Sequence, residues 1–411
     1  MREALTGVSG SRRILIYSHD SFGLGHLRRC REIANALVET YDHLSVLILS
    51  GSPIIGSFDF RPRVDFVRIP GMIKLSNGEY TSHALDIAPE KTLELRAAVI
   101  GETARIFDPD VFLVDKEPLG LRGEVRATLE MLREHGTRIV LGLRDVMDDP
   151  DALEPEWKRK KAHSALRDLY DDIWVYGLPQ ICDPLEGVDL PDSVRRKMVY
   201  TGYLRRRVSP RPDAAVNLVG TEPYILVTPG GGGDGDALVD WVVRAYEQDP
   251  DQPYRALVVF GPFMQGEQQQ AFRQRIEALA NVEAITFYNQ METLIAGATG
   301  VIAMGGYNTF CEILSFDKPA IIVPRTRPRM EQSIRAARAQ ELGLVRMLDP
   351  DDGRPARVMA TAIRQLPQQG RPSDVVVPGL LDGLDNVNRL VGRALDQARL
   401  PPLRFAEAGG D

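Results

Sequence analysis

Short apolar, β-branched segments alternate along this chain with amphipathic segments, and this alternation constrains the fold more than any other feature. In the segment 27–39, for example, Leu27, Cys30, Ala34 and Leu37 recur at helical spacing. Strands that alternate with helices predict parallel βαβ units, in which helices cover both faces of the sheet. The strand candidates of this first series are 13–17, 45–49, 64–68, 111–114, 138–142 and 172–176.

The alternation stops at residues 201–215, where proline and arginine replace the periodic pattern, and such an interruption is typical of an interdomain linker. A second series follows, with strand candidates at 224–228, 255–260, 282–287, 300–303 and 320–323. We therefore predict an α/β fold of two Rossmann-like, doubly wound parallel-sheet domains that face each other across a cleft.

The predicted domain boundaries follow from this break and from a final helical segment. They are 1–204 for the N-terminal domain, 205–215 for the linker, 216–382 for the C-terminal domain, and 383–411 for a helix and tail that pack back towards the N-terminal domain. Ligands of such folds bind at the carboxyl ends of the strands, so the turns that follow the strands are the places to look for a site.

Composition excludes several classes of function. A net charge of −7, from 50 Lys and Arg against 57 Asp and Glu, argues against a nucleic-acid partner, which would need a basic face. The three cysteines, Cys30, Cys182 and Cys311, show no disulfide or metal spacing, so we expect a reducing cytoplasmic setting. We see no signal peptide and no membrane span, so any membrane contact is expected to be peripheral.

The turn after the first strand, "SFGLGH", opens a helix and contains Gly23, Gly25 and His26. It lacks the G-x-G-x-x-G series of a dinucleotide-binding turn. The glycines fit a tight turn, but a tight turn does not require a histidine. Imidazole is suited to proton transfer near neutral pH, so His26 is a candidate general base, with Asp20 or Asp115 to orient it. The alternative is a helix-start histidine bonded to the backbone.

Two arginines follow in the same helix. Arg28 and Arg29 could bind a phosphate or carboxylate of a substrate, or Arg28 could pair with Glu32 on the helix surface. His19, in contrast, is expected to be structural.

A glycine-rich turn, "TPGGGGDGD", follows the first strand of the second series. Gly231 and Gly232 there allow the backbone to approach a ligand closely, and phosphate is the commonest such ligand. Asp234 and Asp236 resemble a metal-binding pair but are placed as well to cap the next helix, and we expect no metal.

The stretch from 303 to 332 is the most informative. A strand ends before two glycines, and a helix is expected to start near Asn308 and Thr309, which creates an anion-binding helix terminus. Thr309 and Glu312 have the spacing of a capping box, so Glu312 could simply close the helix. Glu331 and Gln332, at the start of the next helix, suit sugar hydroxyls or are ordinary helix-start residues.

With these motifs, "GLGH" and "GGYNTFCEIL…KPAIIVPRTRPRMEQ", the chain resembles a GT-B glycosyltransferase of the family-28 type, the family of the lipid-intermediate N-acetylglucosaminyltransferase of peptidoglycan synthesis. The resemblance spans nearly the whole chain and is strongest in the second half. It implies an acceptor-side N-terminal domain, with Gly23, Gly25, Arg28 and Arg29 on the acceptor side, and a C-terminal domain that binds a nucleotide sugar.

The resemblance also implies roles for individual residues. The UDP diphosphate would bind at Gly306, Tyr307, Asn308 and Thr309, with Arg325 assisting, and Glu312 would bind the ribose hydroxyls. The donor sugar would contact Glu331 and Gln332, Tyr288 would lie where backbone groups contact the uracil, and His26 would activate the acceptor.

The first turn departs from that family, because it has fewer glycines and carries "LRRC". In this form, "GLGHLRRC" is similar to the UDP-sugar hydrolase of pseudaminic acid biosynthesis, in which such a histidine lies near an attacking water. Against the hydrolase, the chain is longer and has extra segments at 71–96 and 115–124 that could form an acceptor site.

The sequence therefore predicts a metal-independent, inverting glycosyltransferase that moves a hexose from a UDP-sugar to a hydroxyl acceptor, without a cofactor. The acceptor could be a small metabolite or lipid-linked. The alternatives are a UDP-sugar hydrolase and a nucleotide-sugar-binding protein without activity.

Overall fold

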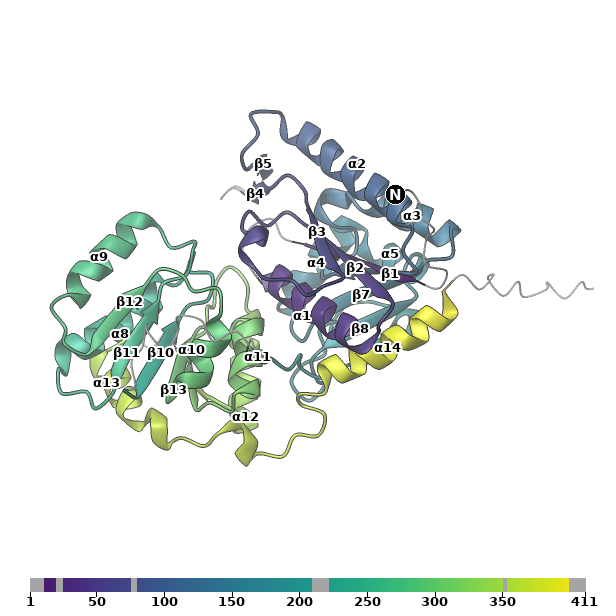
Figure 1. The fold of residues 1–411 in the computed structure, drawn as a ribbon. Helices are drawn as coiled ribbons and strands as arrows, with labels where there is room; N and C mark the ends of the chain where they lie inside the picture. The colour runs from purple at the N-terminus through teal and green to yellow at the C-terminus, as the bar shows by residue number, and fades with distance from the viewer. Residues whose placement is uncertain (1–10, 20–24, 75–79, 209–221, 350–352, 399–411) are drawn as a thin grey trace, which may run out of the picture.

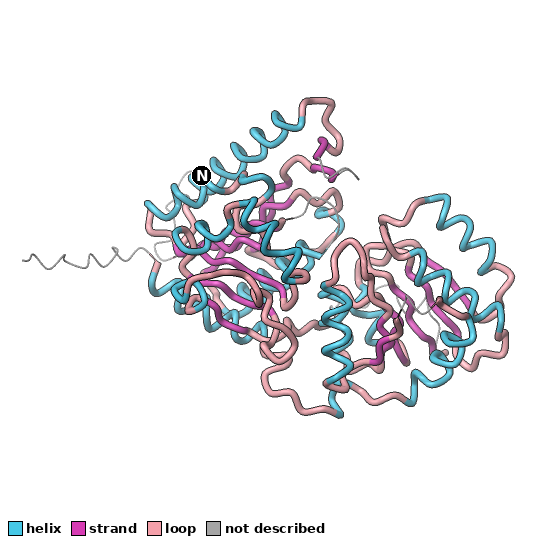
Figure 2. Tube along the Cα trace, turned by 180° about the vertical axis from the view of Figure 1, so that it is seen from behind, coloured by secondary structure: helices cyan, strands magenta, loops and turns pink. Residues whose placement is uncertain are grey.

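The computed structural model describes residues 11–19, 25–74, 80–208, 222–349 and 353–398. It contains two parallel α/β domains that lie side by side, each with helices flanking a central sheet (Figures 1 and 2). Gly23, Asp20 and most of the predicted linker lie outside the described residues.

The N-terminal sheet has seven parallel strands in the order β3-β2-β1-β6-β7-β8-β9. Alternate side chains of β1 enter different cores, because Ile14 and Ile16 pack on one face of the sheet and Leu15 and Tyr17 on the other. The strands are β1 (Arg12–Ser18), β2 (Leu44–Ser50), β3 (Val64–Arg68), β6 (Val111–Asp115), β7 (Arg138–Arg144), β8 (Asp172–Tyr176) and β9 (Met198–Tyr200).

Helices cover both faces of this sheet, as doubly wound parallel sheets require. One core includes residues of α2 and α3, and the other includes residues of α1 and α14. The helices of this domain are α1 (Gly25–Thr40), α2 (Pro89–Phe107), α3 (Arg126–Glu134), α4 (Pro150–Lys160), α5 (Ala162–Asp168) and α6 (Asp192–Arg195).

The C-terminal sheet has six parallel strands in the order β12-β11-β10-β13-β14-β15. Its strands are β10 (Tyr224–Thr228), β11 (Arg255–Val259), β12 (Val282–Ile285), β13 (Gly300–Ala303), β14 (Ala320–Ile322) and β15 (Arg346–Met347). Its helices are α8 (Asp236–Gln248), α9 (Gly266–Ile276), α10 (Met291–Gly297), α11 (Tyr307–Ser315), α12 (Glu331–Glu341) and α13 (Ala356–Gln365).

The last helix, α14 (Gly383–Gln397), leaves the C-terminal domain and lies against α1, where Figure 1 shows it in yellow beneath the N-terminal sheet. The Tyr41 hydroxyl donates to the Asn388 carbonyl at 2.8 Å, and the Asn386 amide donates to the Thr201 carbonyl at 2.7 Å. These bonds attach the end of the described chain to the first domain.

The predicted fold class is confirmed, and the strand predictions fail mainly where the strands are short. The structure adds a hairpin of β4 (Met72–Lys74) and β5 (Tyr80–Ser82) and the short edge strands β9 and β15. The predicted strand 282–287 ends at Ile285. Two or three residues rarely show the alternation that identifies a strand in a sequence, and β14 was predicted only because it lies within a longer apolar run.

The two domains share one continuous apolar core. Tyr203, which precedes the interdomain segment, packs against Tyr307 and Phe310 of α11, with ring centroids 6.0 and 5.1 Å away. All three belong to a cluster that also contains residues of both sheets. The domain interface therefore buries aromatic surface instead of being only a polar contact.

A buried ion pair crosses the same interface. Arg335 of α12 donates from Nε and from one terminal nitrogen to the two carboxylate oxygens of Asp145, at 2.6 Å each, and both residues are at most 1% exposed. The Tyr203 hydroxyl donates to Asp145 at 2.7 Å, and Arg335 also donates to the Gly305 carbonyl at 3.0 Å. Paired and hydrogen-bonded charges of this kind tolerate burial.

We expect Asp145→Ala to lower the free energy of unfolding by about 3–5 kcal/mol, because the substitution leaves the Arg335 guanidinium buried without its partner. Chemical denaturation followed by circular dichroism measures the change. Adding Arg335→Met to that variant should restore part of the loss. The matched control is Glu341→Ala, which breaks an exposed pair with Arg338 and should change stability little. Equal stability of Asp145→Ala and the unaltered protein would contradict this role.

Candidate functional site

A cavity of about 320 Å³ lies between the two domains. Its walls include Arg144 at the end of β7, Thr228 at the end of β10 and Val259 at the end of β11. The carboxyl ends of strands from both sheets therefore contribute to one cavity, as expected for ligand sites in doubly wound folds.

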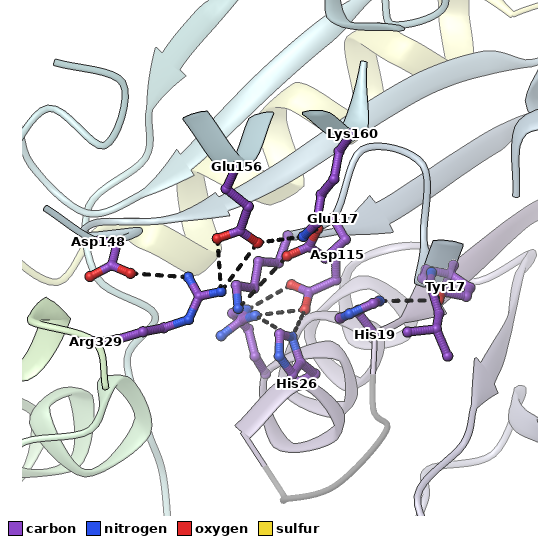
Figure 3. A network of polar contacts seen from close by, with 12 residues as sticks. Tyr17, His19, His26, Asp115, Glu117, Asp148, Glu156, Lys160 and Arg329 are labelled. Atoms are coloured by element: carbon purple, nitrogen blue, oxygen red, sulfur yellow. Dashed lines mark hydrogen bonds and ion pairs between the residues drawn. The ribbon is translucent and has the colours of Figure 1, made fainter. Parts of the chain in front are cut away.

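His26 and Asp115 form a hydrogen-bonded pair at this cavity (Figure 3). His26 is the second residue of α1, and Asp115 is the last residue of β6, which lies beside β1 in the sheet. The distance from His26 Nδ1 to Asp115 Oδ2 is 2.5 Å. Arg29, one helical turn after His26, binds both Asp115 oxygens at 2.8 and 2.6 Å. Asp115 lies behind His26, which itself lines the cavity.

The electrostatics favour a neutral imidazole. Burial lowers the pKa of His26 to about 4, an effect larger than the opposing effect of the Asp115 carboxylate. Burial by itself raises the pKa of Asp115, but Arg29 and His26 bring it well below its ordinary value. An ionised Asp115 accepts the proton of Nδ1, which leaves Nε2 of His26 as an unprotonated base.

His19 lies close to His26, with ring centroids 5.8 Å apart, but it belongs to a different network. Its Nδ1 is 3.2 Å from the Tyr17 hydroxyl (Figure 3). That hydroxyl donates to Glu124 at 2.5 Å. Glu124 also receives two bonds from Arg96 at 2.6 Å. Burial lowers the pKa of His19 to about 3, so this histidine is neutral over the physiological range.

Arg28 reaches across the cavity to the other domain. Its guanidinium donates to Glu292 of α10 at 2.8 Å and also to Glu312 of α11. The sequence alternative of a surface pair with Glu32 is therefore wrong, since Arg31 binds Glu32 instead. Burial raises the pKa of Glu312 to about 7, against the opposing effect of Arg28.

The terminus of α11 meets the cavity at Gly306, Tyr307, Asn308 and Thr309. Gly305 has φ of 76°, and a Cβ there would lie 2.7 Å from Ile322, so this turn requires glycine. Gly306 is the N-cap residue, and neither a side-chain cap nor an acidic first turn neutralises the helix terminus.

Two details of α11 differ from the sequence interpretation. The helix begins at Tyr307, so Thr309 is inside the first turn and does not form a capping box with Glu312. Asn308 bonds to protein groups, since its amide donates to the Gly25 carbonyl at 3.0 Å and accepts from Arg206 at 2.7 Å. Asn308 therefore connects the terminus of α11 to the first turn of the other domain.

The glycine-rich turn divides into two parts. Gly231 lines the cavity, whereas Gly232 is not among the residues of its wall. A Cβ on Gly232 would lie 2.3 Å from the Phe260 carbonyl oxygen, so packing within the domain already accounts for this glycine. Of the candidate site residues, Gly232 is thus explained without a ligand.

Arg325 organises the remaining donor-side candidates. It donates to Asp234 at 2.5 Å and to Glu331, and its backbone N–H donates to the Gln332 side chain at 2.9 Å. Asp234, Arg325 and Glu331 therefore form a chain of side chains with alternating negative, positive and negative charges. Tyr288, Arg325, Glu331 and Gln332 all line the cavity. Within the described residues, no group of three His, Cys, Asp or Glu side chains is arranged to hold a metal ion.

The sequence pattern did not identify Glu292 or Arg144 as site residues. Arg144 lines the cavity, and Glu292 accepts a hydrogen bond from Arg28, which also lines it. Glu292 follows no strand directly, and only its contact with Arg28 reveals its position. Arg144 is the last residue of β7, and its place at the carboxyl end of a strand could have identified it as a site residue from the sequence.

Within the part of the chain that the structure describes, none of the helices has the length and apolar character that a membrane span needs.

The comparisons with known proteins agree with this geometry. Residues 224–369 match the family model described as the glycosyltransferase family 28 C-terminal domain. No curated protein matches the chain. Many solved structures match it, and those described below share the arrangement of two domains across a cleft, the GT-B architecture.

Three solved structures illustrate the likeness. CalG4, the calicheamicin glycosyltransferase, has a TM-score of 0.59 and 16% identity, and the match covers 96% of this chain and 100% of CalG4. UGT71G1 of Medicago truncatula, complexed with UDP-glucose, has a TM-score of 0.61 and 15% identity over 94% and 99% of the two chains. MurG of Acinetobacter baumannii has a TM-score of 0.55 and 13% identity over 93% and 99%.

At these identities the solved structures show the fold alone, which is the GT-B arrangement of two domains. The likeness to glycosyltransferase family 28 is carried by the C-terminal domain, where the family model matches.

The raised pKa of Glu312 predicts a pH dependence of stability. Because the folded-state pKa of about 7 exceeds the ordinary value of 4.5, the contribution is present at low pH and is lost as the pH rises through about 7. Relative to Glu312→Gln, the unaltered protein should lose stability on the order of 2 kcal/mol between pH 5 and 8. Urea denaturation of both proteins at both pH values measures this difference, and parallel pH profiles would contradict it.

Proposed function

We propose that this protein transfers a hexose from a UDP-sugar to a hydroxyl acceptor in the interdomain cavity, with His26 as the general base. The observation that carries the proposal is the position of the His26–Asp115 pair, which shares one cavity with the uncapped terminus of α11. A base and an anion-binding terminus on opposite walls are the two parts that displacement of UDP by an alcohol requires.

In this mechanism the acceptor hydroxyl donates a hydrogen bond to Nε2 of His26. As the acceptor oxygen attacks the anomeric carbon, His26 takes its proton and Asp115 stabilises the imidazolium that forms. The bond between the anomeric carbon and the diphosphate oxygen breaks at the same time. A single displacement of this kind inverts the anomeric configuration.

The departing UDP gains negative charge, which the N–H groups at the start of α11 stabilise. Glu312 binds the ribose hydroxyls, and UDP therefore competes with Arg28 for this carboxylate. Arg28, once released, turns towards the diphosphate. Together with Arg325, these groups supply the positive charge that the leaving group needs, and we propose that the reaction requires no metal.

The proposed acceptor is a small metabolite or a lipid-linked alcohol. The β4–β5 hairpin and the start of α2 come from the extra segment of the N-terminal domain and would contribute to its binding. A lipid-linked acceptor would place the enzyme at the inner face of the membrane, by peripheral contact from the cytoplasm.

UDP release from UDP-sugars, measured with and without candidate alcohols, tests the proposed reaction. Release that depends on the alcohol supports transfer. Release without any alcohol would assign a hydrolase in which His26 activates water, and UDP binding without turnover would assign a binding protein.

His26→Ala should reduce turnover by about 10²- to 10⁴-fold, because the base is removed, and should leave the Kd for UDP unchanged. Calorimetry and the UDP-release assay measure the two quantities separately. Because the base acts when unprotonated and the pKa of His26 is about 4, kcat/KM of the unaltered enzyme should fall only as the pH drops through about 4. Full turnover by His26→Ala would eliminate His26 as the base.

Glu312→Ala should weaken UDP binding by about tenfold, because a carboxylate bonded to ribose contributes about 1.5–3 kcal/mol. The unaltered protein should also bind UDP more tightly than 2′-deoxy-UDP, and the variant should not discriminate between them. Calorimetric titration of both ligands measures this. If Glu312→Ala changed only the thermal stability, Glu312 would have a structural role alone.

A further inference from the structure

The arginines that line the cavity differ in one respect, which is whether a carboxylate neutralises them. Arg28 binds Glu292 and Glu312, Arg29 binds Asp115, and Arg325 binds Asp234 and Glu331. Arg144 is the exception, because its guanidinium makes no hydrogen bond or ion pair with any residue that the structure describes, and its Nε is buried without a partner.

A second cation lies beside it. Lys116 follows β6, and its backbone N–H donates to the Gly142 carbonyl of β7 at 2.7 Å, so Lys116 and Arg144 occupy neighbouring strand ends. Lys116 is only 9% exposed, and among the described residues its nearest carboxylate oxygen, on Glu117, is 4.0 Å away. Glu117 is itself bound to Lys160 at 2.8 Å.

The backbone of Lys116 is also unusual. Its φ is 70°, in the left-handed region that a lysine rarely adopts. Strained residues of this kind concentrate at ligand sites, where the surrounding structure holds them in place. Here the strain accompanies a buried ammonium group at the carboxyl end of a central strand.

The surroundings make both cations unfavourable in the absence of a ligand. Burial lowers the pKa of Lys116 to about 7, and the charge of Arg144 is the next largest cause. Burial likewise lowers the pKa of Arg144 to about 10. Two adjacent, partly desolvated cations without full partners destabilise the folded protein unless an anion joins them.

The residues around these two cations indicate where an anionic ligand would bind. His26, Arg144 and Glu331 line the same cavity, so Arg144 shares it with both the proposed base and a proposed sugar-binding residue. Lys116, at the neighbouring strand end, affects the pKa of His26 and is itself affected by Glu331. Glu331 supplies only partial compensation, because its Oε1 is bound to Arg325 and its Oε2 has no hydrogen-bond partner.

We propose that Arg144 and Lys116 form an anion-binding subsite that holds a carboxylate or phosphate group of a substrate between His26 and Glu331. This inference rests on the proposed function and narrows its substrates to acidic ones. The acidic group belongs either to the donor sugar, as in a UDP-uronic acid, or to the acceptor.

Two titrations distinguish these sources. If the donor carries the anion, the protein should bind UDP-glucuronic acid about tenfold or more tightly than UDP-glucose, and Arg144→Gln should abolish the difference. If the acceptor carries it, the two UDP-sugars should bind equally, and inorganic phosphate should bind to the UDP-saturated protein and lose about tenfold in affinity in Arg144→Gln. Lys116→Gln should cause a loss in the same titration.

Thermal unfolding separates this role from a structural one. Arg144→Gln without ligand should keep or raise Tm, because it removes a partly desolvated, unpaired cation. Arg144→Lys should recover part of the anion binding. Arg126→Gln, which changes a partly exposed arginine of α3 outside the cavity, is the matched control and should alter neither quantity.

The inference is overturned if neither titration depends on Arg144, or if Arg144→Gln lowers Tm while anion binding is unchanged. Failure of the proposed function looks different: either UDP release does not depend on an alcohol, which leaves these binding titrations unaffected, or UDP itself does not bind. In that case phosphate titrated without UDP still tests the subsite.

Discussion

The buried ion pair between Arg335 and Asp145 is the interaction on which the geometry of the cavity depends. Asp145 follows the last residue of β7 in the N-terminal domain, and Arg335 lies in α12 of the C-terminal domain. The same guanidinium holds the Gly305 carbonyl, in the turn that leads into α11. The terminus of α11 is thereby positioned relative to the N-terminal sheet, and so relative to His26. The guanidinium and the carboxylate form two parallel hydrogen bonds and are fully buried. A small displacement of one domain would break these bonds, and no water could take the place of the lost partner.

A second set of contacts crosses the cavity nearer to its chemistry. Arg28 joins α1 to Glu312 and Glu292, and Asn308 joins α11 to the carbonyl of Gly25. These contacts involve side chains that the proposed donor would use, unlike the pair of Arg335 and Asp145. The interface therefore has one part that only supports the structure and another part that a ligand would rearrange. This division lets UDP compete with Arg28 without separating the domains.

The fold could be predicted from the sequence because each long strand or helix shows its own apolar periodicity within a few consecutive residues. The strands β1, β3, β8, β10 and β13 were all identified, while most strands of two or three residues, such as β4 and β15, were not. For the site, the sequence showed which residues follow strands, and this led to His26 and Asp115. It could not show partners distant in the chain. One of the two alternatives for Arg28 was a pair with Glu32, four residues away, but its partners are 264 and 284 residues distant. Gly232 was assigned to a ligand because the carbonyl that excludes a side chain there belongs to another loop.

The distribution of charge in the cavity bears on what such a protein can bind. A buried cation is expected to have a carboxylate partner in the unliganded protein, and Arg28, Arg29 and Arg325 all do. Arg144 and Lys116 occupy equally sheltered positions without such partners, so they lower stability in the unliganded state. Natural proteins keep unfavourable groups of this kind mainly where function requires them. The pairing of the other arginines is what makes Arg144 informative, because each of them has a hydrogen-bonded carboxylate, whereas Glu331 acts on Arg144 without a hydrogen bond. A substrate that brings its own negative charge would complete the same pattern of paired charges.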